Sequence, residues 1–207
     1  MRYEIPDLAP GEHLEHEIEI EKSRFITWTA FVPDPASFEA LLTRAREAHP
    51  NASHHCTAYN AGAPGEQNAI GFSDDGEPGG TAGRPMYQAL EGSGMGQVGC
   101  VVIRYFGGTK LGTGGLVRAY TQAVVKALER LPRRAFVERR PLTVRVDFAG
   151  EAIAREWFAT QDARVEGADY AGDGVTLDVA WPRERDADLS ELTSRLKGRL
   201  TRLDAST

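Results

Sequence analysis

Hydrophobic and polar residues alternate in short runs over the first third of the chain, and this period of two predicts β-strands. From Leu14 to Glu21, apolar residues or histidine alternate with glutamate, which is typical of an edge strand with one charged face. Residues 24–32 predict a second strand. Two more are expected over 54–59 and 69–72, on either side of a turn at Gly62–Gly65.

A different period, with apolar residues three and four positions apart, predicts three helices in the same half. The first begins at Pro33–Pro35, and the second is expected from about 81 to 90. Residues 98–103 form a continuous apolar run, which indicates a strand buried on both faces. A third helix follows that strand, with Thr113 expected as its N-cap and Leu131 near its end. The predicted order β-β-α-β-β-α-β-α indicates an α+β domain built in layers.

The periodicity stops after Leu131-Pro132 and restarts at Leu142, and four arginines lie in the connector between them. We therefore expect two domains, over residues 1–134 and 135–207. In the second, the pattern predicts a strand, a helix, a hairpin through Gly172-Asp173-Gly174 and a last helix from Asp188 to Leu203. This β-α-β-β-α order predicts a small ferredoxin-like sandwich, with or without its last strand.

The junction between the buried strand and the third helix carries the candidate chemistry of the chain. It combines five glycines with basic residues at the start of a helix, where free backbone N–H groups favour a phosphate-type anion. A purely structural turn is the alternative, because the spacing matches neither common phosphate-loop pattern. The predicted anion- or RNA-binding residues are Lys22, Arg24, Arg104, Gly107, Gly108, Lys110, Gly112, Thr113, Gly114, Gly115, Arg118 and Lys126.

The net charge of −6 argues at first against a nucleic-acid partner, but the charges are unevenly distributed. Residues 1–21 hold one basic and seven acidic side chains, whereas residues 104–134 hold seven basic and one acidic. On the third helix Arg118, Lys126 and Arg130 belong to a polar stripe opposite the apolar face. The stripe predicts either a functional basic surface or an ordinary solvated helix face.

A metal-dependent enzyme is a rival hypothesis, because histidines and acidic residues cluster over 54–77. Neighbouring residues of a strand point to opposite faces, so His54 and His55 are not expected to share an ion, and no metal site is predicted. The secondary candidates for a functional role are His54, Asp74, Asp75 and Glu77. Pairing of Asp74 or Asp75 with Arg104 would stiffen two glycine-rich loops without any ligand.

The order of residues in the glycine-rich segment adds a family resemblance. From Arg104 to Tyr120 the chain reads RYFGGTKLGTGGLVRAY, which resembles the signature of the Impact/YigZ family. Blocks at Ser53–Tyr59 and Ser73–Pro85 resemble two further parts of that family's pattern, and Lys22–Phe25 resembles its N-terminal block. Together these matches cover about residues 18–130.

The resemblance implies a first domain similar to the second domain of ribosomal protein S5. It also implies a second domain like the last, ferredoxin-like domain of elongation factor G, as in bacterial members of the family. Eukaryotic relatives regulate translation, although they join the first domain to a different module. A contact with RNA, the ribosome or translation factors is therefore implied by analogy.

The composition limits the remaining function classes. No apolar run is long enough to span a membrane, and the first residues do not resemble a signal peptide, so a cytoplasmic protein is expected. Cys56 and Cys100 lie in strand patterns and are expected to be buried thiols. The sequence thus predicts a non-catalytic, cofactor-free binding protein that contacts RNA or the translation machinery. The alternative is an enzyme acting on a phosphorylated small molecule in a cleft near Asp74 and Arg104.

Overall fold

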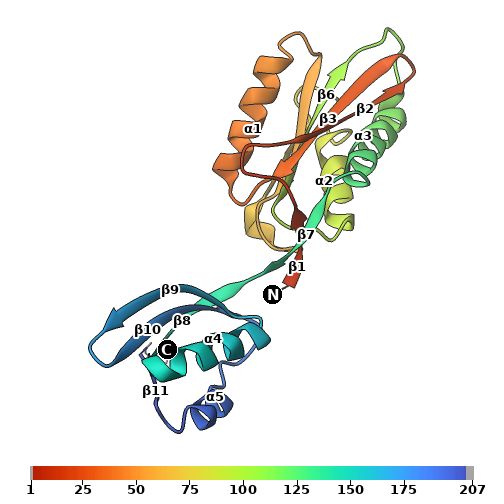
Figure 1. Cartoon of the computed structure of the whole chain (residues 1–207). Coiled ribbons are helices and arrows are strands. Elements are labelled where there is room, and N and C mark those ends of the chain that lie inside the picture. The colour runs from red at the N-terminus through yellow and green to blue at the C-terminus, as the bar shows by residue number, and fades with distance from the viewer. Residues whose placement is uncertain (1, 204–207) are drawn as a thin grey trace. The chain divides into compact units, whose positions relative to one another are not determined.

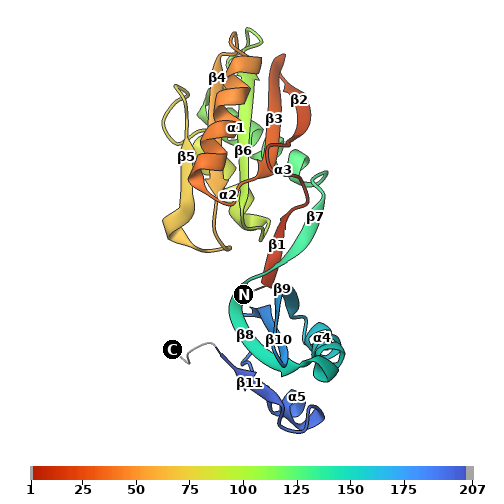
Figure 2. The ribbon, with the colours of Figure 1, turned by 60° about the vertical axis from the view of Figure 1, so that its left-hand side comes forward.

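The computed structural model describes residues 2–203 (Figures 1 and 2). The chain forms two compact units, one made of Tyr3–Phe136 and the other of the chain from Val137 onward together with the first residues. A two-stranded sheet of β1 (Arg2–Pro6) and β7 (Arg133–Val137) lies where the chain passes from one unit to the other. Each unit has its own hydrophobic core and is described by itself.

The first unit contains a five-stranded antiparallel sheet in the order β2-β3-β6-β4-β5. Its strands are β2 (Leu14–Ile20), β3 (Ser23–Phe31), β4 (His54–Asn60), β5 (Ile70–Ser73) and β6 (Val98–Tyr105). The run predicted to be buried on both faces is β6, which lies at the centre of the sheet. At its end, Arg104 pairs in register with Phe25 of β3 on one side and with His54 of β4 on the other.

Helices cover both faces of this sheet, as Figure 1 shows. On one face α1 (Pro35–Ala48) packs against Ile26, Trp28, Val101 and Ile103. On the other, α2 (Gly83–Gly92) and α3 (Gly112–Leu128) pack against Phe25, Cys56, Cys100 and Val102. Alternation along the strands therefore decides which residues face α3. Both cysteines are free and buried, as the sequence predicts.

Several predicted boundaries in this unit are corrected. Thr113 is not the N-cap of α3, because the helix already begins at Gly112 with Leu111 in the cap position. The helix ends at Leu128 rather than near Leu131. The connector contributes β7, and its partner β1 was not predicted, because five residues ending in proline give little periodicity. A short 3₁₀ helix, Gln67–Ala69, precedes β5.

The second unit is a four-stranded antiparallel sheet in the order β11-β8-β10-β9. Along the chain its elements run β-α-β-β-α-β, which is the ferredoxin-like arrangement. The α+β class expected from the sequence is confirmed. The elements are β8 (Arg139–Asp147), the 3₁₀ helix Phe148–Gly150, α4 (Glu151–Thr160), β9 (Arg164–Ala171), β10 (Gly174–Pro182), α5 (Ser190–Arg195) and β11 (Leu200–Arg202).

The prediction of a long last helix from Asp188 to Leu203 is wrong. Helix α5 ends at Arg195, because Lys197 and Gly198 adopt left-handed backbone angles with φ of 52° and 78°. Leu192 and Leu196 reach the core as expected, but Leu200 does so from the short strand β11. The sandwich therefore has its last strand.

Candidate functional site around the start of α3

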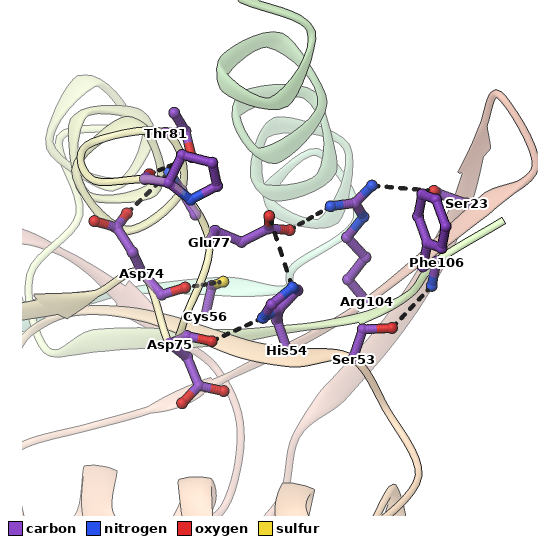
Figure 3. A network of polar contacts seen from close by, with 12 residues as sticks. Ser23, Ser53, His54, Cys56, Asp74, Asp75, Glu77, Thr81, Arg104 and Phe106 are labelled. Atoms are coloured by element: carbon purple, nitrogen blue, oxygen red, sulfur yellow. Dashed lines mark hydrogen bonds and ion pairs between the residues drawn. The ribbon is translucent and has the colours of Figure 1, made fainter. Parts of the chain in front are cut away.

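A cluster of polar side chains lies beneath α3, and we call it the Glu77 cluster. It consists of four buried residues, Ser23, Glu77, Arg104 and Tyr120, and of the partly exposed His54. Arg104 Nη1 donates to Glu77 Oε1 at 2.5 Å, and the Tyr120 hydroxyl donates to the same oxygen at 2.7 Å. The side chains of Glu77 and Arg104 are only 4% and 6% exposed. Figure 3 shows Glu77 between His54 and Arg104. Two opposite charges thus share a site that is almost closed to water.

The sheet register explains how Arg104 comes to this place. Its side chain points to the α3 face, where its guanidinium lies 5.5 Å from the ring centroid of Phe25 and 5.7 Å from that of Phe106. Nη2 donates to Ser23 Oγ at 3.3 Å, whereas Nε is buried without a partner in the described part of the chain. Arg104 is therefore held by Glu77, Ser23 and two aromatic rings, and its role in binding an anion or RNA stays a prediction.

The thiol and the phenol of this region are neutral near pH 7. Burial raises the pKa of the Cys56 thiol to about 12 and also raises the pKa of the Tyr120 phenol. The thiol donates to the Asp74 carbonyl oxygen at 3.0 Å, and its sulfur lies 3.3 Å from the Tyr120 oxygen. Because a nucleophilic cysteine needs a lowered pKa, Cys56 has the character of a structural thiol.

Asp74 serves the fold by capping helix α2 from a distance. Its carboxylate accepts backbone N–H bonds from Gly80 at 2.8 Å, Ala82 at 3.0 Å and Gly83 at 2.8 Å. Partial burial alone would raise the pKa of Asp74, but these three donors outweigh it, and the pKa is lowered. The first amides of α2 are thereby satisfied by a residue outside the helix.

Asp75 turns away from Arg104 and binds the other side of β4. Its carboxylate accepts the His55 N–H at 2.6 Å and lies 3.4 Å from Arg46. His54 donates from Nδ1 to the Asp75 carbonyl oxygen at 2.8 Å, and its Nε2 lies 3.7 Å from Glu77 Oε2. The expected pairing of Asp74 or Asp75 with Arg104 is therefore wrong, since Glu77 takes that place.

The glycine-rich turn after β6 packs closely on the β2–β3 hairpin. A Cβ atom on Gly107 would lie 2.0 Å from the carbonyl carbon of Lys22, so only glycine fits there. The Gly107 N–H donates to Ser23 Oγ at 3.2 Å, which ties the turn to the Glu77 cluster. Gly108 and Gly112 have φ of 88° and 70°, a backbone region that favours glycine.

Polar groups at the start of α3 have no side-chain partner in the described part of the chain. No side chain of the described residues caps the helix, although its first turn holds Thr113, Gly114 and Gly115. Lys110 and Arg118 are exposed, and across residues 2–203 neither side chain has a hydrogen bond or an ion pair. Two cavities flank the helix start, with volumes of about 360 and 400 Å³, and Lys110 lines both.

Two of the other predicted basic residues pair with acidic residues away from the helix start, and the third has no ion pair in the part of the chain that the structure describes. Arg24 points to the α1 face, where it binds Glu17 at 2.7 Å, because it neighbours Phe25 on the strand. Lys126 forms an exposed ion pair with Glu129 at 2.9 Å. Lys22 lies at the exposed hairpin tip, with φ of 67°. Of these three, Lys22 alone is near the turn and has no charged partner among residues 2–203.

Sequence reasoning missed three residues that shape the site: Ser23, Phe106 and Tyr120. Tyr120 has the spacing of the apolar face of the third helix, but a buried tyrosine needs a partner for its hydroxyl, and that requirement is the available signal. Phe106 is half-exposed, and its N–H donates to Ser53 Oγ at 3.1 Å. Ser23 and Phe106 both lie inside the sequence blocks that carry the family resemblance.

Between residues 2 and 203, no three His, Cys, Asp or Glu side chains gather closely enough to hold a metal ion. None of the helices in that range is both long and apolar enough to cross a membrane.

Comparison with known proteins decides the family. The model of the Impact N-terminal domain matches residues 21–128, which contain the Glu77 cluster, the glycine-rich turn and α3. The chain belongs to the Impact/YigZ family. The resemblance noted from the sequence is thereby confirmed.

Members of the Impact/YigZ family match over nearly the whole chain. The IMPACT family member YigZ of Escherichia coli is 41% identical over 88% of this chain and 89% of its own length. An IMPACT family member of Haemophilus influenzae is 38% identical over 93% and 94%. A crystal structure described as that of a hypothetical protein matches with a TM-score of 0.68 and 37% identity, over 99% of this chain and 98% of that one.

Proposed function

We infer that the first unit binds RNA, with the phosphate backbone at the start of α3. The observation that carries this proposal is the uncapped helix start beside Lys110 and Arg118, whose charges no other described residue neutralises. Helix N-terminal amides and cations favour the same anionic guest. Most other polar groups of the site are bonded within the fold; the exceptions are Arg104 Nε and Glu77 Oε2, which have no hydrogen bond among the described residues.

The surface of α3 extends this anion site. Arg118 and Gln122 are exposed along the helix, and Arg130 is exposed just beyond its end at Leu128. Lys22 lies at the hairpin tip beside the glycine-rich turn. Several phosphates in a row therefore fit this surface better than a single small ion. RNA of the translation machinery is the partner that the family resemblance favours, and a role in regulating translation in the cytoplasm belongs to the same proposal.

Salt-dependent RNA binding tests the proposal. A panel of single-stranded and structured RNAs is titrated at two salt concentrations, and affinity is expected to fall steeply as salt rises. The double charge reversal Lys110→Glu with Arg118→Glu should weaken binding for every sequence in the panel. Arg164→Glu is the matched control, because Arg164 is an exposed arginine of the second unit without a partner in the described chain. No binding at low salt, or equal loss in the control, contradicts the proposal.

An enzyme acting near Asp74 and Arg104 has less support. Asp74 caps α2 and Arg104 is paired with Glu77, so neither side chain is free to act on a substrate. The nearby cavity still has the size of a small-ligand site.

A further inference from the structure

A cavity of about 360 Å³ lies between the Glu77–Pro78 loop and the glycine-rich turn. It is lined both by residues of the Glu77 cluster and by the start of α3. Pockets for small ligands have volumes of roughly 300–1,000 Å³, so it can take one compact molecule. Its walls are of three kinds: apolar side chains, a pair of buried charges and the first residues of α3. They are Glu77, Pro78, Arg104, Phe106, Lys110, Leu111, Gly112, Thr113 and Leu116.

Glu77 offers a hydrogen-bond acceptor inside this cavity. Its Oε1 accepts from Arg104 and Tyr120, but between residues 2 and 203 Oε2 has only the 3.7 Å contact with His54 Nε2. The Glu77 side chain is only 4% exposed, and Glu77 is one of the residues that line the cavity. A carboxylate oxygen that has no hydrogen bond within the described chain can accept one from a ligand.

Phe106 offers a flat surface at the cavity. One side of its ring lies against the Arg104 guanidinium, 5.7 Å from the ring centroid, and its backbone is fixed by the bond to Ser53. The side chain is nevertheless 51% exposed. An exposed aromatic ring held in place at the mouth of a cavity is a stacking platform for a nucleobase.

We propose that this cavity binds one nucleotide, with its base against Phe106, a base or ribose donor on Glu77, and its phosphate at Lys110 and the start of α3. Inorganic phosphate would use only the last of these contacts, and a nucleoside only the first two. The nucleotide is either a free nucleoside monophosphate or a nucleotide of an RNA strand, since both present the same groups. This inference rests on the proposed function in one respect: both place a phosphate at Lys110 and the start of α3.

The test is a titration of the full-length protein with each of the four nucleoside monophosphates. Calorimetry measures the affinity, and amide NMR shows which residues are affected. Binding is expected to shift the amide signals of Gly112 and Thr113, and each nucleotide should bind more tightly than inorganic phosphate or its own nucleoside. Phe106→Ala should weaken nucleotide binding about tenfold, because a base loses its stacking partner. Phe72→Ala is the matched control, since Phe72 is 50% exposed and lies outside the cavity.

The outcomes separate this inference from RNA binding by the basic surface. Mononucleotide binding that Phe106→Ala weakens, without salt-dependent RNA binding, supports the nucleotide site and contradicts the proposed function. RNA binding that depends on Lys110 and Arg118, with no mononucleotide binding and no effect of Phe106→Ala, overturns the nucleotide site alone. Equal affinity for phosphate and for nucleotides also overturns it, since the base would then make no contact.

Discussion

The Glu77 cluster and the start of α3 both contribute residues to one cavity, but their charged side chains differ in whether they have partners within the described chain. In the cluster, Arg104 and Tyr120 both donate to Glu77, and the ion pair is almost fully buried. At the helix start, Lys110 and Arg118 are exposed and bind no other described residue. The difference teaches that the first group is used to hold the fold together, whereas the second remains available for a ligand.

The largest effect is expected from breaking the buried pair. Glu77→Ala leaves the Arg104 charge buried without a partner, and this should lower the free energy of unfolding by about 3–5 kcal/mol. Urea unfolding followed by the fluorescence of Trp28, which packs against α1, measures it in the first unit. Lys110→Ala is the control from the other region, with an expected change within about 0.5 kcal/mol. Equal losses of stability in the two variants would contradict the view that the Glu77 cluster holds the fold together and the start of α3 does not.

The contact between the glycine-rich turn and the hairpin should be the next most sensitive. In Gly107→Ala the new Cβ would overlap the Lys22 carbonyl, so the backbone must move at a cost of about 1–3 kcal/mol. Gly79→Ala is the matched control, because a Cβ there meets nothing within 4 Å and its backbone is not left-handed. A harmless Gly107→Ala would show that the turn is not fixed by the hairpin.

The cap on α2 predicts a smaller effect that depends on pH. Asp74→Asn should cost about 1 kcal/mol at pH 7, as is usual for a lost cap. Because the pKa of Asp74 is lower in the folded protein than in the unfolded chain, its charge stabilises the fold above the unfolded pKa of about 4. That stabilisation should disappear as the pH falls through the folded value. Unfolding of both proteins between pH 7 and pH 2.5 measures the difference, and a gap that persists at the lowest pH would contradict this role.

The smallest stability effect is expected at the helix start itself. The double variant Lys110→Glu with Arg118→Glu breaks no contact among the described residues, so its unfolding free energy should change by no more than about 0.5 kcal/mol. Its effect should appear in the salt dependence of RNA binding, whose slope should fall by roughly 0.7–1 per lost phosphate contact. A strongly destabilised double variant would mean that these cations also serve the fold.

The periodicity of the sequence predicted the helices and strands that carry the site. It did not predict which polar side chains form hydrogen bonds or ion pairs with one another. The alternation of β3, β4 and β6 places Phe25, Cys56 and Arg104 on one face, as the structure has them. Three acidic residues follow β5 in one turn, however, and their spacing does not say which reaches Arg104. The path of the turn decides this through the left-handed angles of Asp75 and Gly76, with φ of 42° and 87°.

The same limit applies at the end of the chain. Leucines at 189, 192, 196 and 200 have helical spacing, and only the Lys197-Gly198 break turns the last of them into a strand residue. At the start of α3, the glycines and cations were predicted from composition, whereas the cavity beside them depends on Pro78 and Phe106 from two separate loops. The binding of an anion or of RNA there stays a prediction.

The order of strands in the first unit has a consequence for its synthesis. Strand β6 lies between β3 and β4, yet it follows both of them along the chain. A nascent chain that ends before Val98 therefore has no central strand, and the two halves of the sheet keep open edges that invite wrong pairing. Only when the ribosome has released residues up to Tyr105 can β3 and β4 be joined, and the partner of Glu77 arrives at that same moment, with Arg104. The sheet and its buried charge pair must therefore be completed together, late in translation.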